Sequence, residues 1–330
     1  MNPNLAPAAR RALLGAGLAA ALAAPLGALA AGYPDKPVTL VVPYPPGGAT
    51  DTLARIVARG MGPRLGQPMV VENKGGAGTA IGAGAVAQSA PDGYTLLISS
   101  NTTFTISPGL KAHLPYDPLK SFESIGLLGT SPLVLLAHPS VAASSVKELV
   151  ALAKAKPGKL SYASFGNGTT SHFAGEMFKV MAGVDITHVP YKGSAPAMQD
   201  LIGGQVQLSF DTNVAAIPMV QAGRVKAIAL TSARRSASMP GVPTLAEAGY
   251  PGYEMVPWIT VVAPRGLPEA VRTTLSKALA GALADPAIRA DLDKAGLDVA
   301  YQSGQAYDDK VAKELPLIRA YVHKAGLTID

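Results

Sequence analysis

The sequence of 330 residues contains no cysteine. This absence excludes disulfide scaffolds, thiolate metal sites, iron–sulfur clusters and cysteine nucleophiles, and it leaves no residue for a thioether-linked lipid anchor. Charged residues are also scarce, at 15% against about 25% in an average soluble domain. Because hydrophobic residues make up 48%, the chain can bury a large core, which argues against disorder. A chain of this length is expected to form two domains.

The N-terminus carries the features of an export signal. Arg10 and Arg11 precede a stretch rich in alanine and leucine over residues 12–24, and residues 28–30 are Ala-Leu-Ala, which fits an A-x-A cleavage site. We expect residues 1–30 to be a signal peptide cleaved near Ala30, exported by either the Sec or the twin-arginine route. An N-terminal membrane anchor is the alternative, but an alanine-rich run of this length inserts weakly.

The positive charge of the chain identifies no partner. Lysine and arginine exceed aspartate and glutamate by 28 − 22 = 6, and cleavage of the signal removes two arginines and leaves an excess of 4. A basic run with interleaved aromatic residues is missing, so we expect no nucleic-acid partner.

Short apolar runs alternate with helical patterns along the rest of the chain. The runs are rich in valine, isoleucine and leucine, as expected for strands buried on both faces of a parallel sheet. We expect strands at residues 38–42, 69–71, 94–98, 125–128, 133–137, 160–163, 186–189, 206–210 and 225–230. Ser145 and Glu148 form a capping box that opens a helix. Repeated strand–helix units predict open α/β sheets.

The first informative loop, Pro43 to Asp51, follows the first strand and precedes a helix. Ligands of open α/β sheets bind beyond the carboxyl ends of strands. Gly47 and Gly48 let backbone N–H groups approach a ligand closely, and the helix N-terminus that follows favours an anion. Thr50 or Asp51 is placed to cap that helix. The alternative interpretation is a tight turn with a cap.

Further polar loops follow later strands. Residues 164–172 are dense in glycine and hydroxyl groups and precede a helix, and residues 99–103 form a second polar cluster. Residues 191–193 and 211–213 end two more strands, and Lys192 either lies near an anion or is a surface charge. Each loop can also be a plain capped or solvated turn.

Catalytic and cofactor interpretations find little support. The five histidines show no metal-binding spacing, and the glycine-rich residues 76–82 lack the spacing of a dinucleotide loop. We therefore expect no metal and no cofactor. One catalytic alternative stays open: an exported hydrolase of small esters or amides that uses Ser171, His172 and Asp211.

The ordered series of segments resembles the Bug-type receptors, the periplasmic solute-binding subunits of tripartite tricarboxylate transporters. Residues 43–51 resemble the family's P-x-P-P-G-G-x-x-D segment, and residues 164–172 resemble its S-x-G-x-G-T-x-S-H segment. The resemblance covers the whole mature chain. Further matches follow at residues 190–193, Asp211, residues 243–253, Trp258 and residues 263–268.

The resemblance implies an α/β, two-lobed periplasmic-binding-protein (Venus-flytrap) fold. Two open sheets flanked by helices are joined by two crossover strands, which we place near residues 125–128 and 225–230. Lobe I then comprises residues 31–124 and 231–330, and lobe II comprises residues 125–230.

The resemblance also implies a function without catalysis. We expect a monomeric periplasmic receptor that captures a small carboxylate between its lobes and delivers it to the membrane permease subunits of a tripartite transporter. Backbone amides, hydroxyls and bridging waters hold the ligand, and Tyr44 and Phe165 form apolar walls. The candidate ligand-binding residues are Tyr44, Pro46, Gly47, Gly48, Asn101, Thr102, Ser164, Phe165, Gly168, Thr169, Thr170, His172, Tyr191, Lys192 and Asp211.

We make a separate prediction for each of three residues in the C-terminal half of the chain. Trp258 is expected near the cleft, because the matching family segment lies there. Thr260 stands where family members usually have glycine, which changes the cleft if that position borders it. Pro316 is expected to kink the last helix.

Overall fold

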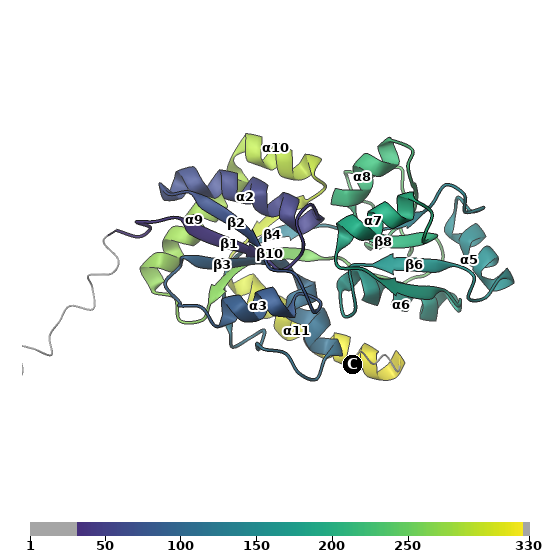
Figure 1. Ribbon diagram of the computed structural model, residues 1–330, viewed down its shortest axis with the longest axis horizontal. Coiled ribbons are helices and arrows are strands. Elements are labelled where there is room, and N and C mark those ends of the chain that lie inside the picture. Colours follow the sequence, from purple (N-terminus) through teal and green to yellow (C-terminus); the bar gives the residue numbers. More distant parts are fainter. Residues whose placement is uncertain (1–31, 326–330) are drawn as a thin grey trace, which may run out of the picture.

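The computed structural model describes residues 32–325, so the expected signal peptide lies outside the described residues. Within that range the strands form two sheets side by side, each covered by helices (Figure 1). The first sheet has the order β11-β4-β10-β3-β1-β2. Its strands are β1 (Val38–Val42), β2 (Met69–Asn73), β3 (Thr95–Ser100), β4 (Phe122–Thr130), β10 (Trp258–Pro264) and β11 (Asp298–Gln302).

The first sheet buries side chains on both faces. Strand β1 runs parallel to β2 and β3, and its Val-Thr-Leu-Val-Val sequence supplies apolar side chains to both layers, as a doubly covered parallel strand requires. One face packs on α2 (Ala49–Leu65), α9 (Glu269–Ala284) and α10 (Pro286–Lys294). The other face packs on α3 (Ala80–Ala87) and on the first half of α11 (Gln305–Ala325).

The second sheet has five strands in the order β7-β6-β8-β5-β9. They are β5 (Leu133–Ala137), β6 (Ser161–Ser164), β7 (Thr187–Pro190), β8 (Leu208–Thr212) and β9 (Lys226–Leu230). One face packs on α5 (Val146–Ala155) and α6 (Thr170–Ala182), and the other packs on α7 (Ser194–Ile202) and α8 (Asn213–Gln221). The expected capping box begins α5, where the Ser145 hydroxyl accepts a hydrogen bond from the Glu148 N–H at 3.2 Å.

The chain passes between the sheets later than the sequence predicted. Residues 125–128 lie inside β4, which pairs with β10 in the first sheet from Phe122 to Thr130, so the first passage is at Ser131 and Pro132. The second passage lies near Pro257. Residues 231–256 pack on the second sheet, because Leu245, Tyr253 and Met255 belong to its core. The lobe ranges remain a prediction. Both passages lie to the C-terminal side of the positions that the sequence predicted.

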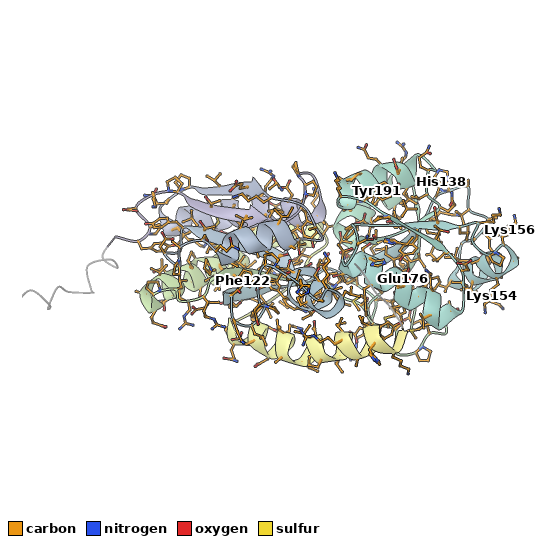
Figure 2. All side chains as sticks on the ribbon, turned by 60° about the horizontal axis from the view of Figure 1, so that its bottom comes forward. Phe122, His138, Lys154, Lys156, Glu176 and Tyr191 are labelled. Atoms are coloured by element: carbon orange, nitrogen blue, oxygen red, sulfur yellow. The ribbon has the colours of Figure 1, made fainter. Side chains whose placement is uncertain are left out.

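Helix α11 lies along one side of both lobes (Figure 2). Its first half buries Tyr307 and Val311 against the first sheet. Its second half packs Ile318 and Tyr321 against the core of the second lobe. The helix runs through Pro316 as one element. In Figure 2, Phe122 marks the first lobe, whereas His138, Lys154 and Lys156 mark the far end of the second.

The helices over residues 32–325 include none that is both long and apolar enough to cross a membrane.

Candidate functional site

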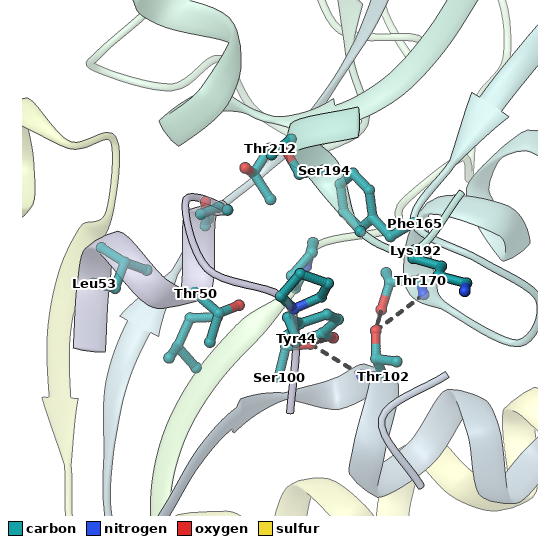
Figure 3. A pocket seen from close by; sticks show the side chains of 18 of the residues that line it. Tyr44, Thr50, Leu53, Ser100, Thr102, Phe165, Thr170, Lys192, Ser194 and Thr212 are labelled. Atoms are coloured by element: carbon teal, nitrogen blue, oxygen red, sulfur yellow. Dashed lines mark hydrogen bonds between the residues drawn. The ribbon is translucent and has the colours of Figure 1, made fainter. Parts of the chain in front are cut away.

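A cavity lies between the two lobes, beyond the carboxyl ends of β1 and β8 (Figure 3). We call it the interlobe cavity. Both lobes and both passages between them contribute to its wall, which places it where closure of the lobes would enclose a ligand. The lining residues are Tyr44, Pro45, Gly48, Ala49, Thr50, Leu53, Ser100, Thr102, Ser131, Phe165, Thr170, Lys192, Gly193, Ser194, Ala195, Pro196, Thr212, Pro257 and Ile259.

The loop between β1 and α2 forms the wall of the first lobe. Gly47 has a φ of 82°, a conformation that favours glycine, and its N–H donates to the Asp51 carboxylate at 3.0 Å. Arg55 and Asn73 also donate to Asp51, at 3.1 Å each. Asp51 therefore fastens the loop, whereas Gly48 occupies the N-cap position of α2.

Asp51 is held in its ionised form although it is buried. Its burial opposes ionisation, but hydrogen bonds from Arg55, the Gly47 N–H and Asn73, together with the Arg55 charge, outweigh that effect and lower the pKa of Asp51 below its ordinary value. The first lobe thus keeps one permanent carboxylate behind the loop, with its charge balanced by Arg55.

Beyond β3 the chain forms a π-helical turn, η1 (Thr102–Ile106). π-Turns are rare and are frequent at functional sites. This turn directs Thr102 into the interlobe cavity beside Tyr44 and Ser100. The hydroxyl groups of Tyr44 and Ser100 lie 3.4 Å apart (Figure 3).

The two lobes touch directly at the edge of the cavity. The hydroxyl groups of Thr102 and Thr170 are 2.7 Å apart, and the Thr170 N–H donates to the Thr102 hydroxyl at 3.1 Å. The Thr170 hydroxyl also donates to the side-chain oxygen of Asn101 at 2.9 Å. Nearby, Ser107 donates to the Gly168 carbonyl at 2.9 Å. These contacts join the two lobes at this edge of the cavity.

The far end of the cavity is polar and belongs to the second lobe. Ser194 and Thr212 face the cavity opposite Tyr44 and Ser100 (Figure 3). Behind them, Asp211 is fully buried and accepts hydrogen bonds from the Ser194 hydroxyl, at 2.9 and 3.0 Å, and from the Thr212 N–H, at 2.8 Å. Burial raises the pKa of Asp211 to about 8, against the opposing hydrogen bonds from Ser194 and Thr212.

Three helices begin at the wall of the cavity. Gly48, Gly193 and Thr212 occupy the N-cap positions of α2, α7 and α8, and none of the three helices receives a side-chain cap among the described residues. Helix N-termini expose N–H donors and carry partial positive charge. Together with the ammonium group of Lys192 they favour an anion in the cavity.

The structure brings together part of the predicted set of site residues. Tyr44, Gly48, Thr102, Phe165, Thr170 and Lys192 line the interlobe cavity. Asn101 and Asp211 stand one hydrogen bond behind it. Thr169 caps α6 by accepting from the His172 N–H, Gly47 is engaged with Asp51, and Gly168 accepts from Ser107.

The other predicted residues lie away from this cavity. Ser164 is hydrogen-bonded to His188 at 2.6 Å, and Tyr191 donates to Asp200 at 2.7 Å. Pro46 is exposed and outside the lining. Sequence reasoning missed Ser194, Thr212 and Ser131. Ser194 directly follows the predicted residues 191–193, and Thr212 lies within the predicted residues 211–213, so the helix starts after residues 193 and 212 were the signal that could have found them.

The hydrolase arrangement is not assembled. Ser171 donates its hydroxyl hydrogen to the Phe210 carbonyl, while His172 accepts from the Gly168 N–H at 3.3 Å and stacks on His188 with 4.0 Å between ring centroids. Burial lowers the pKa of His172 to about 4. The two side chains of the expected nucleophile and base therefore have other partners.

Two residues of β10 that the sequence singled out do not line the interlobe cavity. Trp258 points away from the interlobe cavity: its ring stacks on Phe104, and its N–H donates to Glu314 of α11 at 2.8 Å. Side chains alternate along a strand, so the next residue, Ile259, is the one that lines the cavity. Thr260 is fully buried and donates to the Gly126 carbonyl at 3.0 Å, so it does not border the cavity either.

The described residues offer no cluster of three or more histidine or acidic side chains able to hold a metal ion.

Comparison with known proteins gives a family and several relatives. The family model described as "Tripartite tricarboxylate transporter family receptor" matches residues 53–327. BugT of Bordetella pertussis is 39% identical over 270 residues, which cover 82% of each chain. The solved structure of the periplasmic binding protein BugD is 39% identical, with a TM-score of 0.86 over 90% of this chain and 99% of its own. MatC from Rhodopseudomonas palustris with bound malate is 33% identical, with a TM-score of 0.83 over 88% and 100%. The expected two-lobed binding-protein fold is confirmed by these neighbours.

Proposed function

Because this chain belongs to the tripartite tricarboxylate transporter receptor family, we propose that its interlobe cavity binds a small carboxylate. In this role the protein works in the periplasm as a monomer and presents the enclosed ligand to the permease subunits of a tripartite transporter. The family consists of solute-binding receptors, and no step of this function requires catalysis.

One observation carries the proposal: uncapped helix N-termini from both lobes meet at one cavity. Gly48 at the start of α2 and Gly193 at the start of α7 lie on opposite walls. A carboxylate can accept hydrogen bonds from these N–H groups and from the hydroxyls of Thr102 and Thr170. Lys192 adds one cation to an otherwise neutral set of donors. The malate bound to MatC, a relative by fold and sequence, is a ligand of this chemical class.

Closure of the lobes supplies the signal to the permease. The hydrogen bonds between Thr102 and Thr170 already join the lobes beside the cavity, and a ligand that contacts both walls adds to them. To shift an equilibrium between open and closed lobes from 1:99 to 99:1, the ligand must favour the closed state by about 5.5 kcal/mol.

The test is a ligand panel applied to mature protein from residue 31 onward. Malate, succinate, adipate, citrate, benzoate and aspartate are compared by melting temperature and by calorimetric titration. A carboxylate at a hundredfold excess over Kd stabilises the folded state by about 2.7 kcal/mol. Calorimetry is preferred to tryptophan fluorescence, because Trp258 lies behind the sheet and not in the cavity.

The matched control uses the amide of each ligand that binds, with every carboxylate converted to a carboxamide. An amide keeps the size of the carboxylate but has lost its charge, so it should bind at least a hundredfold more weakly. Equal affinity for acid and amide, or a panel without any binding carboxylate, would contradict the proposal.

A further inference from the structure

Asp211 is a buried carboxylate whose charge is not balanced. It lies at the end of β8 and is fully buried, and the ion pairs among the described residues do not include it. Its partners are the hydroxyl of Ser194 and the N–H of Thr212. A buried ion without a cation is costly, so this position needs an explanation beyond packing.

A single hydroxyl group separates Asp211 from the interlobe cavity. Ser194 lines the cavity and holds its oxygen 2.9 and 3.0 Å from the two carboxylate oxygens of Asp211. Thr212 lines the same end of the cavity, and its hydroxyl is buried without a hydrogen-bond partner among the described residues. The hydroxyl that this end of the cavity offers a ligand is therefore that of Ser194, and it is engaged with Asp211.

A serine hydroxyl has one proton to donate, and Asp211 decides where that proton points. When Asp211 is ionised, the Ser194 proton is held by the carboxylate, and only oxygen lone pairs face the cavity. When Asp211 is protonated, its own O–H donates to the Ser194 oxygen. The Ser194 proton is then free to donate to a ligand carboxylate.

We propose that the ligand carboxylate binds at Ser194 together with one proton that Asp211 takes up from solvent. The step balances without a covalent change: one solvent proton moves to an oxygen of Asp211, and the Ser194 hydroxyl turns from Asp211 to the ligand. Asp211 acts through Ser194 and is a positioning residue. This inference rests on the proposed function and adds proton uptake to it.

The electrostatics of the site agree with this coupling. Burial raises the pKa of Asp211 to about 8, so its protonation changes across the neutral range. A ligand carboxylate beside Ser194 adds a second negative charge near Asp211 and favours the protonated form further. Conversely, an ionised Asp211 turns lone pairs toward the ligand and places a negative charge behind them, so it weakens binding.

Other titratable groups around Asp211 are engaged elsewhere or face the cavity. The neighbouring strand β5 and the helix α8 carry none. The titratable side chains of β6, α6, α7 and the loop before α7 are Tyr162, His172, Glu176, Lys179, Tyr191, Lys192 and Asp200. Among them, Tyr162 and Lys179 bind Glu176 and Tyr191 binds Asp200. Lys192 shares the interlobe cavity with Ser194 and acts directly on a bound anion.

The experiment measures proton uptake on the wild-type mature protein. Malate, succinate and adipate are titrated between pH 6.5 and 9 in pairs of buffers with different ionisation enthalpies. Proton uptake should approach one per ligand bound near pH 8.5. Above the pKa of Asp211, Kd should rise about tenfold for each pH unit.

Two variants assign the effect. Asp211→Asn imitates the protonated acid, because its amide donates to Ser194 and its oxygen accepts from Thr212. It should bind with the low-pH affinity of wild type, at every pH, without proton uptake. Ser194→Ala should abolish the uptake and weaken binding at low pH. Circular dichroism checks that both variants fold. The measurement of proton uptake by the wild-type protein does not depend on either variant.

The outcomes are separable. Carboxylate binding with a flat Kd and no proton uptake in wild type would overturn this inference and leave the proposed function standing. The same pH dependence in wild type and Asp211→Asn would overturn it as well, since a group other than Asp211 would then cause it. Absence of carboxylate binding at every pH would reject the proposed function together with this inference.

Discussion

One buried aspartate lies behind each wall of the interlobe cavity, and the pKa values of the two aspartates are shifted in opposite directions. Asp51 in the first lobe and Asp211 in the second are both buried, and both accept backbone and side-chain hydrogen bonds. Asp51 has Arg55 as a partner at 3.0 Å, and its pKa is lowered. Asp211 has only neutral partners, and its pKa is raised to about 8 because burial dominates.

The difference assigns separate tasks to the two walls. A permanently ionised Asp51 holds the Gly47 N–H and fixes the loop that presents Gly48 to the cavity. A titratable Asp211 controls the direction of one hydroxyl, that of Ser194. The first wall is therefore a fixed set of donors, whereas the donors of the second wall depend on pH.

The largest effect is expected from Gly48→Val in the fixed wall. A Cβ at this position meets only the Pro45 carbonyl oxygen, at 3.8 Å, so the side chain has room, and because Gly48 lines the interlobe cavity we expect it to take up space that the ligand needs. We expect carboxylate affinity to fall more than a hundredfold, by calorimetry, with an unchanged fold.

Gly241→Val is the matched control for that variant. Gly241 is exposed and a Cβ there meets nothing within 4 Å, so binding should be retained. If Gly48→Val bound as tightly as wild type, the α2 loop would no longer belong to the site, and the comparison of two walls would fail.

The pH dependence of stability should separate the two aspartates by sign. Asp51 has a lowered pKa, so it stabilises the fold above its unfolded pKa of about 3.9, and that contribution is lost as pH falls through its folded pKa. Asp211 has a raised pKa, so its contribution is complete below about pH 4 and is lost as pH rises toward about 8.

Denaturant unfolding of two asparagine variants measures these signs. Asp51→Asn should be less stable than wild type by about 2 kcal/mol at pH 7, the cost of losing hydrogen bonds to a charged group. The free energy of unfolding of Asp211→Asn should rise relative to that of wild type between pH 5 and pH 8, by up to about 1.4 kcal/mol per pH unit. If the curves of both variants ran parallel to wild type, the contrast between the aspartates would be wrong.

The sequence predicted individual strands and helices better than the way they pack together. The apolar runs at residues 38–42 and 133–137 are strands β1 and β5, because a strand buried on both faces has few polar positions to confuse the pattern. Ser145 caps α5 through the Glu148 N–H as expected, whereas the Glu148 carboxylate accepts from the Ser144 N–H. Strands β10 and β11 were both missed. Strand β11 is partly exposed and lacks an apolar pattern, whereas β10 is buried throughout, and its apolar run was a signal that could have found it.

Site residues were predictable where a loop has unusual composition. Gly48 and Thr170 stand in motifs dense in glycine and hydroxyl groups, and both line the cavity. Ser194 is an ordinary serine in sequence, and only the packing of α7 against β8 brings it to Asp211. Trp258 was misplaced because a motif match locates a segment but does not give the face on which a side chain lies.

The smallest predicted effect concerns the contact between the two walls. Thr170→Val keeps the shape of the side chain and removes the hydroxyl that bonds to Thr102 and Asn101. The closed state then loses about 1–2 kcal/mol, and carboxylate affinity should fall about tenfold at every pH. Thr187→Val, at an exposed position of β7, is the control. A change in the pH dependence of binding in Thr170→Val would show that the lobe contact and Asp211 are coupled. A parallel shift would show that closure and protonation act independently.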